Sequence, residues 1–158
     1  MTDRIWKSLA AGFAGGLIAT AAMTPIHMMA AKLDGPSPPE GEDATVKSAS
    51  AVSEGLFGHK LTTRQKQVAG PLVHFGFGAK MASYYGALAE RNLAETTGLG
   101  LPFGAAVWLG AHVIMVPALG LSKPVAESSL SREASELAAH LVYGAITEFC
   151  RRRALTAL

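Results

Sequence analysis

Long stretches without charged side chains dominate this chain and alternate with polar segments. One runs from Ser8 to Ala31 over 24 residues, and another runs from Thr96 to Ser122 over 27 residues. About 18 or more consecutive apolar residues allow a helix to cross a bilayer, whereas the core helices of soluble proteins seldom need so many. The pattern therefore predicts an all-α integral membrane protein.

Two further apolar segments extend this prediction to a four-helix bundle. The predicted spans are residues 6–32, 67–88, 99–121 and 133–152. The fourth span is the least apolar, because only Leu137 to Thr147 is free of charge there. It crosses the membrane if Glu136 and Glu148 lie near opposite interfaces, about 18 Å apart at a rise of 1.5 Å per residue.

A polar extramembrane loop, residues 33–66, joins the first two predicted spans and opens with the proline-rich stretch Gly35–Glu40. Within the loop, Asp43–Phe57 is predicted to form a short surface helix, because apolar residues recur near helical spacing at Val46, Ala49, Val52 and Leu56. Thr62 or Thr63 is a suitable N-cap for the helix that follows.

The chain begins like a secretory signal peptide, with Arg4 and Lys7 ahead of an apolar run and Ala19–Ala22 resembling a cleavage site. The apolar run continues to Ala31 and is longer than a signal core, so we expect an uncleaved first span. Positive residues in short flanking segments stay in the cytoplasm. Arg4 and Lys7, together with Arg151–Arg153 after the last span, therefore predict that both termini are cytoplasmic.

The composition fits one small membrane domain over residues 1–158, with 49% apolar residues, 16% charged residues and 17 glycines. Small residues such as Gly12 and Gly16 let membrane helices approach closely. A formal charge of +2 without a Lys/Arg stripe excludes a nucleic-acid binder. The single Cys150 cannot form an internal disulfide, and no Cys/His spacing indicates structural zinc.

Each predicted span carries one histidine, and in the predicted topology all four lie roughly 7 to 14 Å below the outer face at 1.5 Å per residue. On the fourth span a polar stripe at helical spacing consists of Glu133, Glu136, His140, Tyr143 and Thr147. Polar groups within a membrane face the interior of a bundle, because contact with lipid is costly. We therefore predict an inward-facing polar chamber lined by His27, His74, His112, His140, Glu136 and Tyr143.

Three roles for this chamber stay open. The imidazoles can serve as hydrogen-bonded links between helices, as a path for protons or a small solute, or as ligands of haem or a metal ion. Glu136 and His140, at i and i+4, are the only potential ligand pair on one helix. No metal site is assigned from the sequence.

Lys80 and Glu148 are the other charges within the predicted spans. Arg151 and Arg152 follow Glu148 at i+3 and i+4, which predicts a local ion pair. The alternative is a pair between Lys80 and Glu148 across the second and fourth spans.

Three stretches carry a resemblance to a known family. They are the His74 helix ending in Tyr84-Tyr85-Gly86, the segment Ala111–Pro117 followed by Gly120-Leu121 and Pro124, and Ser135-Glu136 with His140–Val142, Glu148 and Arg151-Arg152. On these motifs, Leu72–Arg153 resembles the YagU-like family of bacterial inner-membrane proteins, whose biochemical role is not established. The resemblance implies a multi-span helical protein of the inner membrane and draws attention to His112, Glu136 and His140. It supplies no reaction.

No enzyme signature is present, whether a nucleophile elbow, a Walker loop or a Rossmann glycine pattern. We therefore expect a protein without catalytic activity of its own, and no cofactor is assigned. Small residues crowd the spans, which suits close packing against other membrane helices. We expect an accessory or scaffold subunit whose partners are the bilayer and other membrane subunits or copies of itself. The alternative is a histidine-lined bundle that binds haem or metal, or that conducts protons or a small solute.

Overall fold

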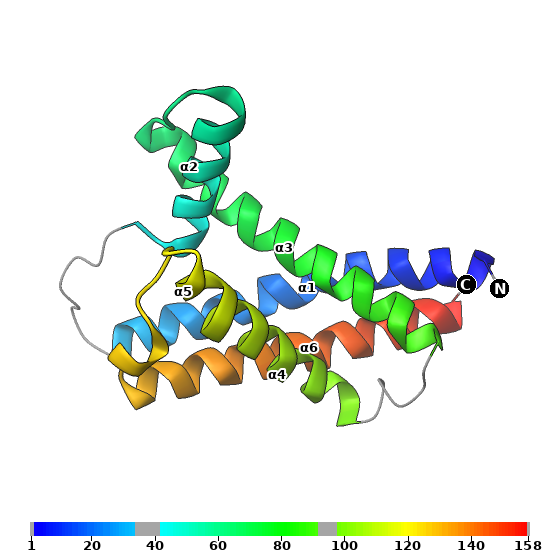
Figure 1. Cartoon of the computed structure of the whole chain (residues 1–158). Helices are drawn as coiled ribbons and strands as arrows, with labels where there is room; N and C mark the ends of the chain where they lie inside the picture. The colour runs from blue at the N-terminus through cyan, green and yellow to red at the C-terminus, as the bar shows by residue number, and fades with distance from the viewer. Residues whose placement is uncertain (1, 34–41, 92–97, 158) are drawn as a thin grey trace.

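A computed structural model describes residues 2–33, 42–91 and 98–157 (Figure 1). Within these ranges the chain is all-helical and forms no strand, which confirms the predicted all-α class. The elements are α1 (Thr2–Leu33), α2 (Ala44–Phe57), α3 (Thr63–Arg91), α4 (Leu101–Val107), the π-helix η2 (Trp108–Met115), α5 (Val116–Ala118), the 3-10 helix η3 (Val125–Glu127) and α6 (Leu130–Ala157).

Side-chain caps fix where α3 and α6 begin. The backbone N–H of Thr62 donates to Gln65 Oε1 at 2.8 Å, and Thr62 Oγ1 accepts from the Gln65 N–H at 3.3 Å. This reciprocal pair is a capping box, so Thr62 is the cap of α3. Ser129 Oγ accepts from the Arg132 N–H at 3.2 Å, and α6 begins at Leu130, three residues before the predicted span.

The third predicted span, residues 99–121, differs from expectation in two ways. Its helix ends at Ala118, because Gly120 adopts a left-handed conformation with φ of 68°. The N–H groups of Gly120 and Leu121 then donate to Pro117 O and Val116 O at 2.9 and 3.1 Å, which satisfies the last carbonyls. The middle of the helix is the π-helix η2, with wider turns than an α-helix, and no sequence pattern predicted it.

The short surface helix predicted in the polar loop is present as α2. Asp43 caps its start by accepting from the Thr45 N–H at 2.8 Å. Gly58 ends it with φ of 65° and donates its N–H to Glu54 O at 3.1 Å. The proline-rich opening of the loop lies outside the described residues.

α1 is the central helix of the structure. It packs against α3 and α6, while α4 packs on α6 and α2 packs on the first half of α3 (Figure 1). Arg4 near the start of α1 pairs with Glu90 near the end of α3, with Arg4 Nε and Glu90 Oε1 2.8 Å apart. α1 and α3 therefore run in opposite directions, and both chain ends lie at this end of the structure.

Small residues let the helices approach closely, as the spacing of Gly12 and Gly16 predicts. A Cβ atom on Gly86 of α3 would overlap the backbone oxygen of Ser8 on α1. A Cβ on Gly104 of α4 would meet the backbone oxygen of His140 on α6 in the same way. Glycine is required at both positions, because any side chain would push the paired helices apart.

Within the described ranges, two helical stretches are long and apolar enough to cross a membrane, Arg4–Met29 and Gly98–Ala118. α3 and α6 contain no stretch that meets the same standard, because many of their positions carry polar or charged residues. Across the described helices, the fully buried side chains include several polar ones: Ser8, Thr20, Thr147 and Glu148. Large apolar side chains point outward instead, among them Phe13, Ile18, Leu72, Leu109 and Ile114.

Candidate functional site

The four histidines on the long helices lie next to one another in space. His27 on α1 has its ring centroid 6.2 Å from that of His74 on α3 and 6.3 Å from that of His140 on α6. His112 on η2 lies 6.3 Å from His140 by the same measure. We refer to His74, His27, His140 and His112, in this spatial order, as the histidine row. It joins residues that are far apart in the sequence.

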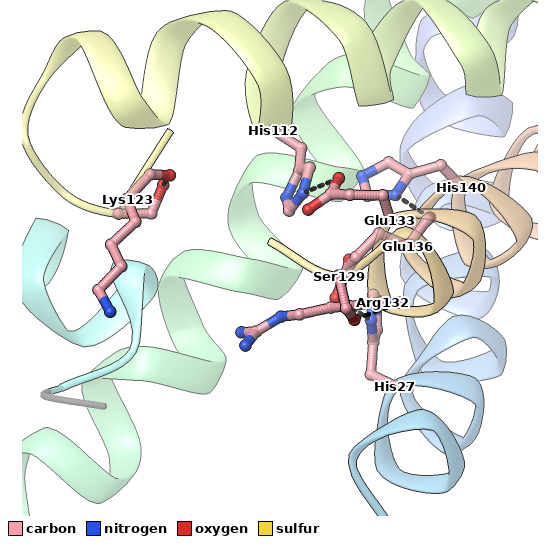
Figure 2. A network of polar contacts seen from close by, with 9 residues as sticks. His27, His112, Lys123, Ser129, Arg132, Glu133, Glu136 and His140 are labelled. Carbon is pink, nitrogen blue, oxygen red and sulfur yellow. Dashed lines mark hydrogen bonds and ion pairs between the residues drawn. The ribbon is translucent and has the colours of Figure 1, made fainter. Parts of the chain in front are cut away.

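Oxygen atoms of α6 hold three rings of the histidine row (Figure 2). Glu136 Oε1 lies 3.2 Å from His27 Nδ1, and the Glu136 backbone oxygen accepts from His140 Nδ1 at 2.8 Å. Glu133 Oε2 lies 3.1 Å from His112 Nε2. An acceptor on one ring nitrogen fixes the orientation and the tautomer of an imidazole.

The second ring nitrogen of these three histidines makes no hydrogen bond within the described part of the chain. An imidazole held on one nitrogen and open on the other can take up or release a proton at the open nitrogen, or can bind a ligand there. The histidine row thus contains the groups that a proton relay requires.

Glu133 was predicted only as a member of the polar stripe on the fourth span, and the structure makes it the partner of His112. The pairing depends on η2, which carries His112 opposite the first turns of α6. Trp108, one η2 turn earlier, stacks on His112 with centroids 6.4 Å apart, and its buried Nε1 has no hydrogen-bond partner among the described residues. Hydrophobic periodicity carries no signal for a π-helix, so this part of the site had to come from the structure.

Tyr143, predicted to line the chamber, lies one turn further along α6 than His140. Its hydroxyl donates to Gly78 O of α3 at 2.6 Å, and its ring packs 5.7 Å from the ring of Phe103. Phe103 in turn stacks on Tyr85 at 4.3 Å. Tyr143 therefore joins α6 to α3 and α4 through its hydroxyl and its ring, in a layer next to the histidine row.

A second polar group lies at the other end of the helices. The Glu148 side chain is 1% exposed and accepts from Arg151 Nε and Nη2 at 2.7 and 2.9 Å, from Arg152 Nε, and from the Tyr85 hydroxyl at 3.0 Å. The predicted local ion pair is confirmed. The alternative pair with Lys80 is wrong, because Lys80 is exposed and its Nζ lies 5.9 Å from the centre of the Tyr84 ring.

No group of three or more His, Cys, Asp or Glu residues in the described ranges is arranged to hold a metal ion. Three of the four imidazoles, those of His27, His112 and His140, are oriented by carboxylate or carbonyl oxygens. Cys150 lies on α6 beyond Glu148 and is not part of the histidine row.

In the part of the chain that the structure describes, the fold is all-helical, two helices are long and apolar enough to cross a membrane, and polar groups gather between the helices. Residues 57–149 match the model of a family described as a protein of unknown function, DUF1440, and the chain belongs to this family. The match includes His74, His112 and His140 but stops short of α1, which supplies His27. No curated protein and no solved structure matches the chain.

Proposed function

We propose that the protein is an integral membrane protein in which α1, α3, the α4–η2–α5 helix and α6 form a four-helix bundle. The observation that carries this proposal is the arrangement of side chains, which is the reverse of that in a soluble protein. Apart from Met23 and Val107, the buried positions of the described residues are occupied by glycine, alanine, hydroxyl-bearing and charged residues, whereas many large apolar residues face outward. Membrane helices pack through small and polar residues because lipid already satisfies their apolar surface.

The bacterial inner membrane, with both termini in the cytoplasm, is the location that we propose. Arg4, Lys7 and Arg91 lie at the end of the helices that also carries Arg151–Arg153. Lys and Arg in the short flanks of membrane spans favour the cytoplasmic side. The basic residues at the opposite end belong to the long polar loop, where Lys66 is paired with Glu42 at 2.6 Å. The resemblance to the YagU-like family supports the same membrane. α2 and the histidine row then lie on the periplasmic side.

Within this membrane we propose a role without catalytic activity, as an accessory or scaffold subunit of a larger assembly. Gly76 on α3 and Gly110 on η2 are exposed, and no atom outside their own helix turns lies within 4 Å of the position of a Cβ there. These notches in an apolar surface are places where another membrane helix fits closely. The partner is a further subunit or a second copy of the chain.

Thiol labelling followed by gentle extraction tests this proposal. In a Cys150→Ser background, Ser131→Cys is expected to react with a membrane-impermeant maleimide in intact cells, whereas Thr156→Cys reacts only after permeabilisation. Ser131 and Thr156 are both exposed and lie at opposite ends of α6. After extraction in a mild detergent, light scattering is expected to give a protein mass well above the 16.4 kDa of one chain.

Three results would contradict the proposal separately. Release of the protein from membranes by alkaline carbonate would remove the membrane assignment. Equal labelling of the two cysteines in intact cells would remove the topology. A lone monomer in mild detergent, with no partner captured by cross-linking in the native membrane, would remove the scaffold role and leave the other two conclusions in place.

A second candidate function is a proton path, or a cofactor site, built on the histidine row. The contacts of Glu136 with His27 and of Glu133 with His112 favour it, because paired carboxylates and imidazoles exchange protons readily. Haem ligation is the other form of this candidate, because two open ring nitrogens suffice for it, whereas a site for a bare metal ion needs more ligands than the described residues bring together.

Proton flux into liposomes distinguishes this candidate from a purely structural role. If the row conducts protons, His27→Ala is expected to lower the flux about tenfold or more, because general acid–base groups contribute at least that much to proton transfer. His59→Ala is the matched control, since His59 is exposed and bonded to Ser53 of α2. No flux with the wild-type protein, together with a colourless and metal-free sample, would end both forms of the candidate.

A further inference from the structure

An open groove lies between α2 and the first turns of α3, away from the other helices. At one end the two helices touch, because a Cβ on Gly70 of α3 would lie 2.8 Å from Val46 Cγ2 of α2. Toward Phe57 and Val68 the helices separate and leave a volume of about 890 Å³. α2 projects from the start of α3 at the end of the molecule opposite the termini (Figure 1).

The walls of this groove are apolar and largely uncovered. The large apolar side chains along or beside it are between 53% and 77% exposed: Val52, Leu56, Phe57, Val68 and Leu72. Several of these on adjoining turns form a continuous patch, and continuous apolar patches on a protein surface mark binding sites. α2 alone does not bury them, so another apolar group must cover them.

The mouth of the groove is basic. The segment after α2 carries His59 and Lys60, and Arg64 on the first turn of α3 lines the groove itself. Ser53 Oγ donates to His59 O at 2.8 Å and lies 2.7 Å from His59 Nδ1, which fixes the turn that presents these residues. Glu54 is the acidic residue within α2 and does not line the groove. An arginine guanidinium suits the oxygen geometry of a phosphate.

We propose that this groove binds an anionic phospholipid, with one acyl chain between α2 and α3 and the headgroup phosphate at Arg64. The proposal rests on the proposed membrane location. Val68 and Leu72 fall within the predicted span 67–88, so the groove is continuous with the lipid-facing surface of α3. An acyl chain enters it from the bilayer without crossing polar surface, and α2 then lies along the interface as an amphipathic helix.

Photo-cross-linking of the full chain in nanodiscs tests the site. The probe is phosphatidylglycerol with a photoreactive group at the end of one acyl chain, in a bilayer of phosphatidylcholine. Cross-linked peptides are expected to come mainly from α2 and the start of α3. Phe57→Ser and Arg64→Glu are each expected to lower the cross-linking of these peptides about tenfold, through lost apolar contact and lost charge pairing respectively.

The matched controls come from the other end of the molecule. Phe149 is exposed on α6, and the guanidinium carbon of Arg153 lies 5.4 Å from the centre of the Phe149 ring. Phe149 and Arg153 therefore have the same side-chain chemistry as Phe57 and Arg64, but no groove lies between them. Phe149→Ser and Arg153→Glu should leave groove cross-linking unchanged. Circular dichroism checks that each variant is folded, and Arg64→Gln repeats the headgroup test without reversing the charge.

Two outcomes would overturn the lipid site. Cross-links spread evenly along the helices and insensitive to Phe57→Ser and Arg64→Glu would show ordinary bilayer contact. Disulfide linkage of Phe57→Cys between two chains, with the same yield with or without phosphatidylglycerol, would show that a second copy fills the groove. A protein that enters nanodiscs but fails this test leaves the membrane proposal standing, whereas a protein that does not enter them contradicts the membrane proposal itself.

Discussion

Replacing Gly86 by alanine is expected to push α1 away from α3 and to lower the unfolding free energy of the protein markedly. The added methyl group would overlap the backbone oxygen of Ser8, and a backbone atom cannot turn aside as a flexible side chain does. Overpacking of this kind costs about 3 kcal/mol of unfolding free energy where the main chain has to move. Titration from a mild detergent into dodecyl sulfate, followed by circular dichroism, measures the loss.

Gly55 of α2 provides the control for this prediction. Its added Cβ meets no atom of the described residues within 4 Å, so Gly55→Ala should leave the unfolding free energy unchanged or raise it by about 0.5 kcal/mol through better helix propensity. Equal stability of Gly86→Ala and Gly55→Ala would show that α1 and α3 do not pack at this distance. The arrangement of the central helices would then be wrong.

Replacing Glu148 by glutamine is expected to destabilise the protein by about 3 kcal/mol, because it leaves the buried Arg151 guanidinium without a counter-charge. Arg151 and Tyr85 both direct donors at the Glu148 carboxylate, and that side chain is 1% exposed. The amide of glutamine has the same shape, so the change tests the charge and not the packing. The same detergent titration gives the free energy.

A double-mutant cycle separates this electrostatic effect from simple loss of a side chain. Adding Arg151→Gln to Glu148→Gln should cost less than the sum of the two single changes, because the unpaired charge is removed together with its partner. Glu127→Gln, at an exposed position of η3, is the control and should be neutral. Additive effects of the two substitutions would mean that Glu148 and Arg151 do not form a pair.

The sequence by itself determined the helices and much of their limits. Long uncharged runs predicted α1 and the α4–η2–α5 helix, because a helix satisfies its own backbone hydrogen bonds wherever water is excluded. Local chemistry also indicated one helix start, because Thr62 is one of the two predicted caps and Gln65 completes a capping box with it. The end of α5 was predicted less well, since Gly120 stops the helix three residues before the predicted limit. The i+3 and i+4 spacing of Arg151 and Arg152 from Glu148 also gave their ion pairs. Each of these features depends on residues within a few turns of one another.

Only the tertiary structure decided which side chains meet across helices. His27 and Glu136 are 109 residues apart, and their contact depends on the register between α1 and α6. Similar registers bring Tyr143 to Gly78 and His112 to Glu133. Close approach of the helices at small residues sets these registers. If one helix were shifted along its neighbour by one turn, every side chain along the contact would meet a different partner. The hydrophobic pattern is nearly unchanged by such a shift, so it predicts that the helices form but not which residues they bring together.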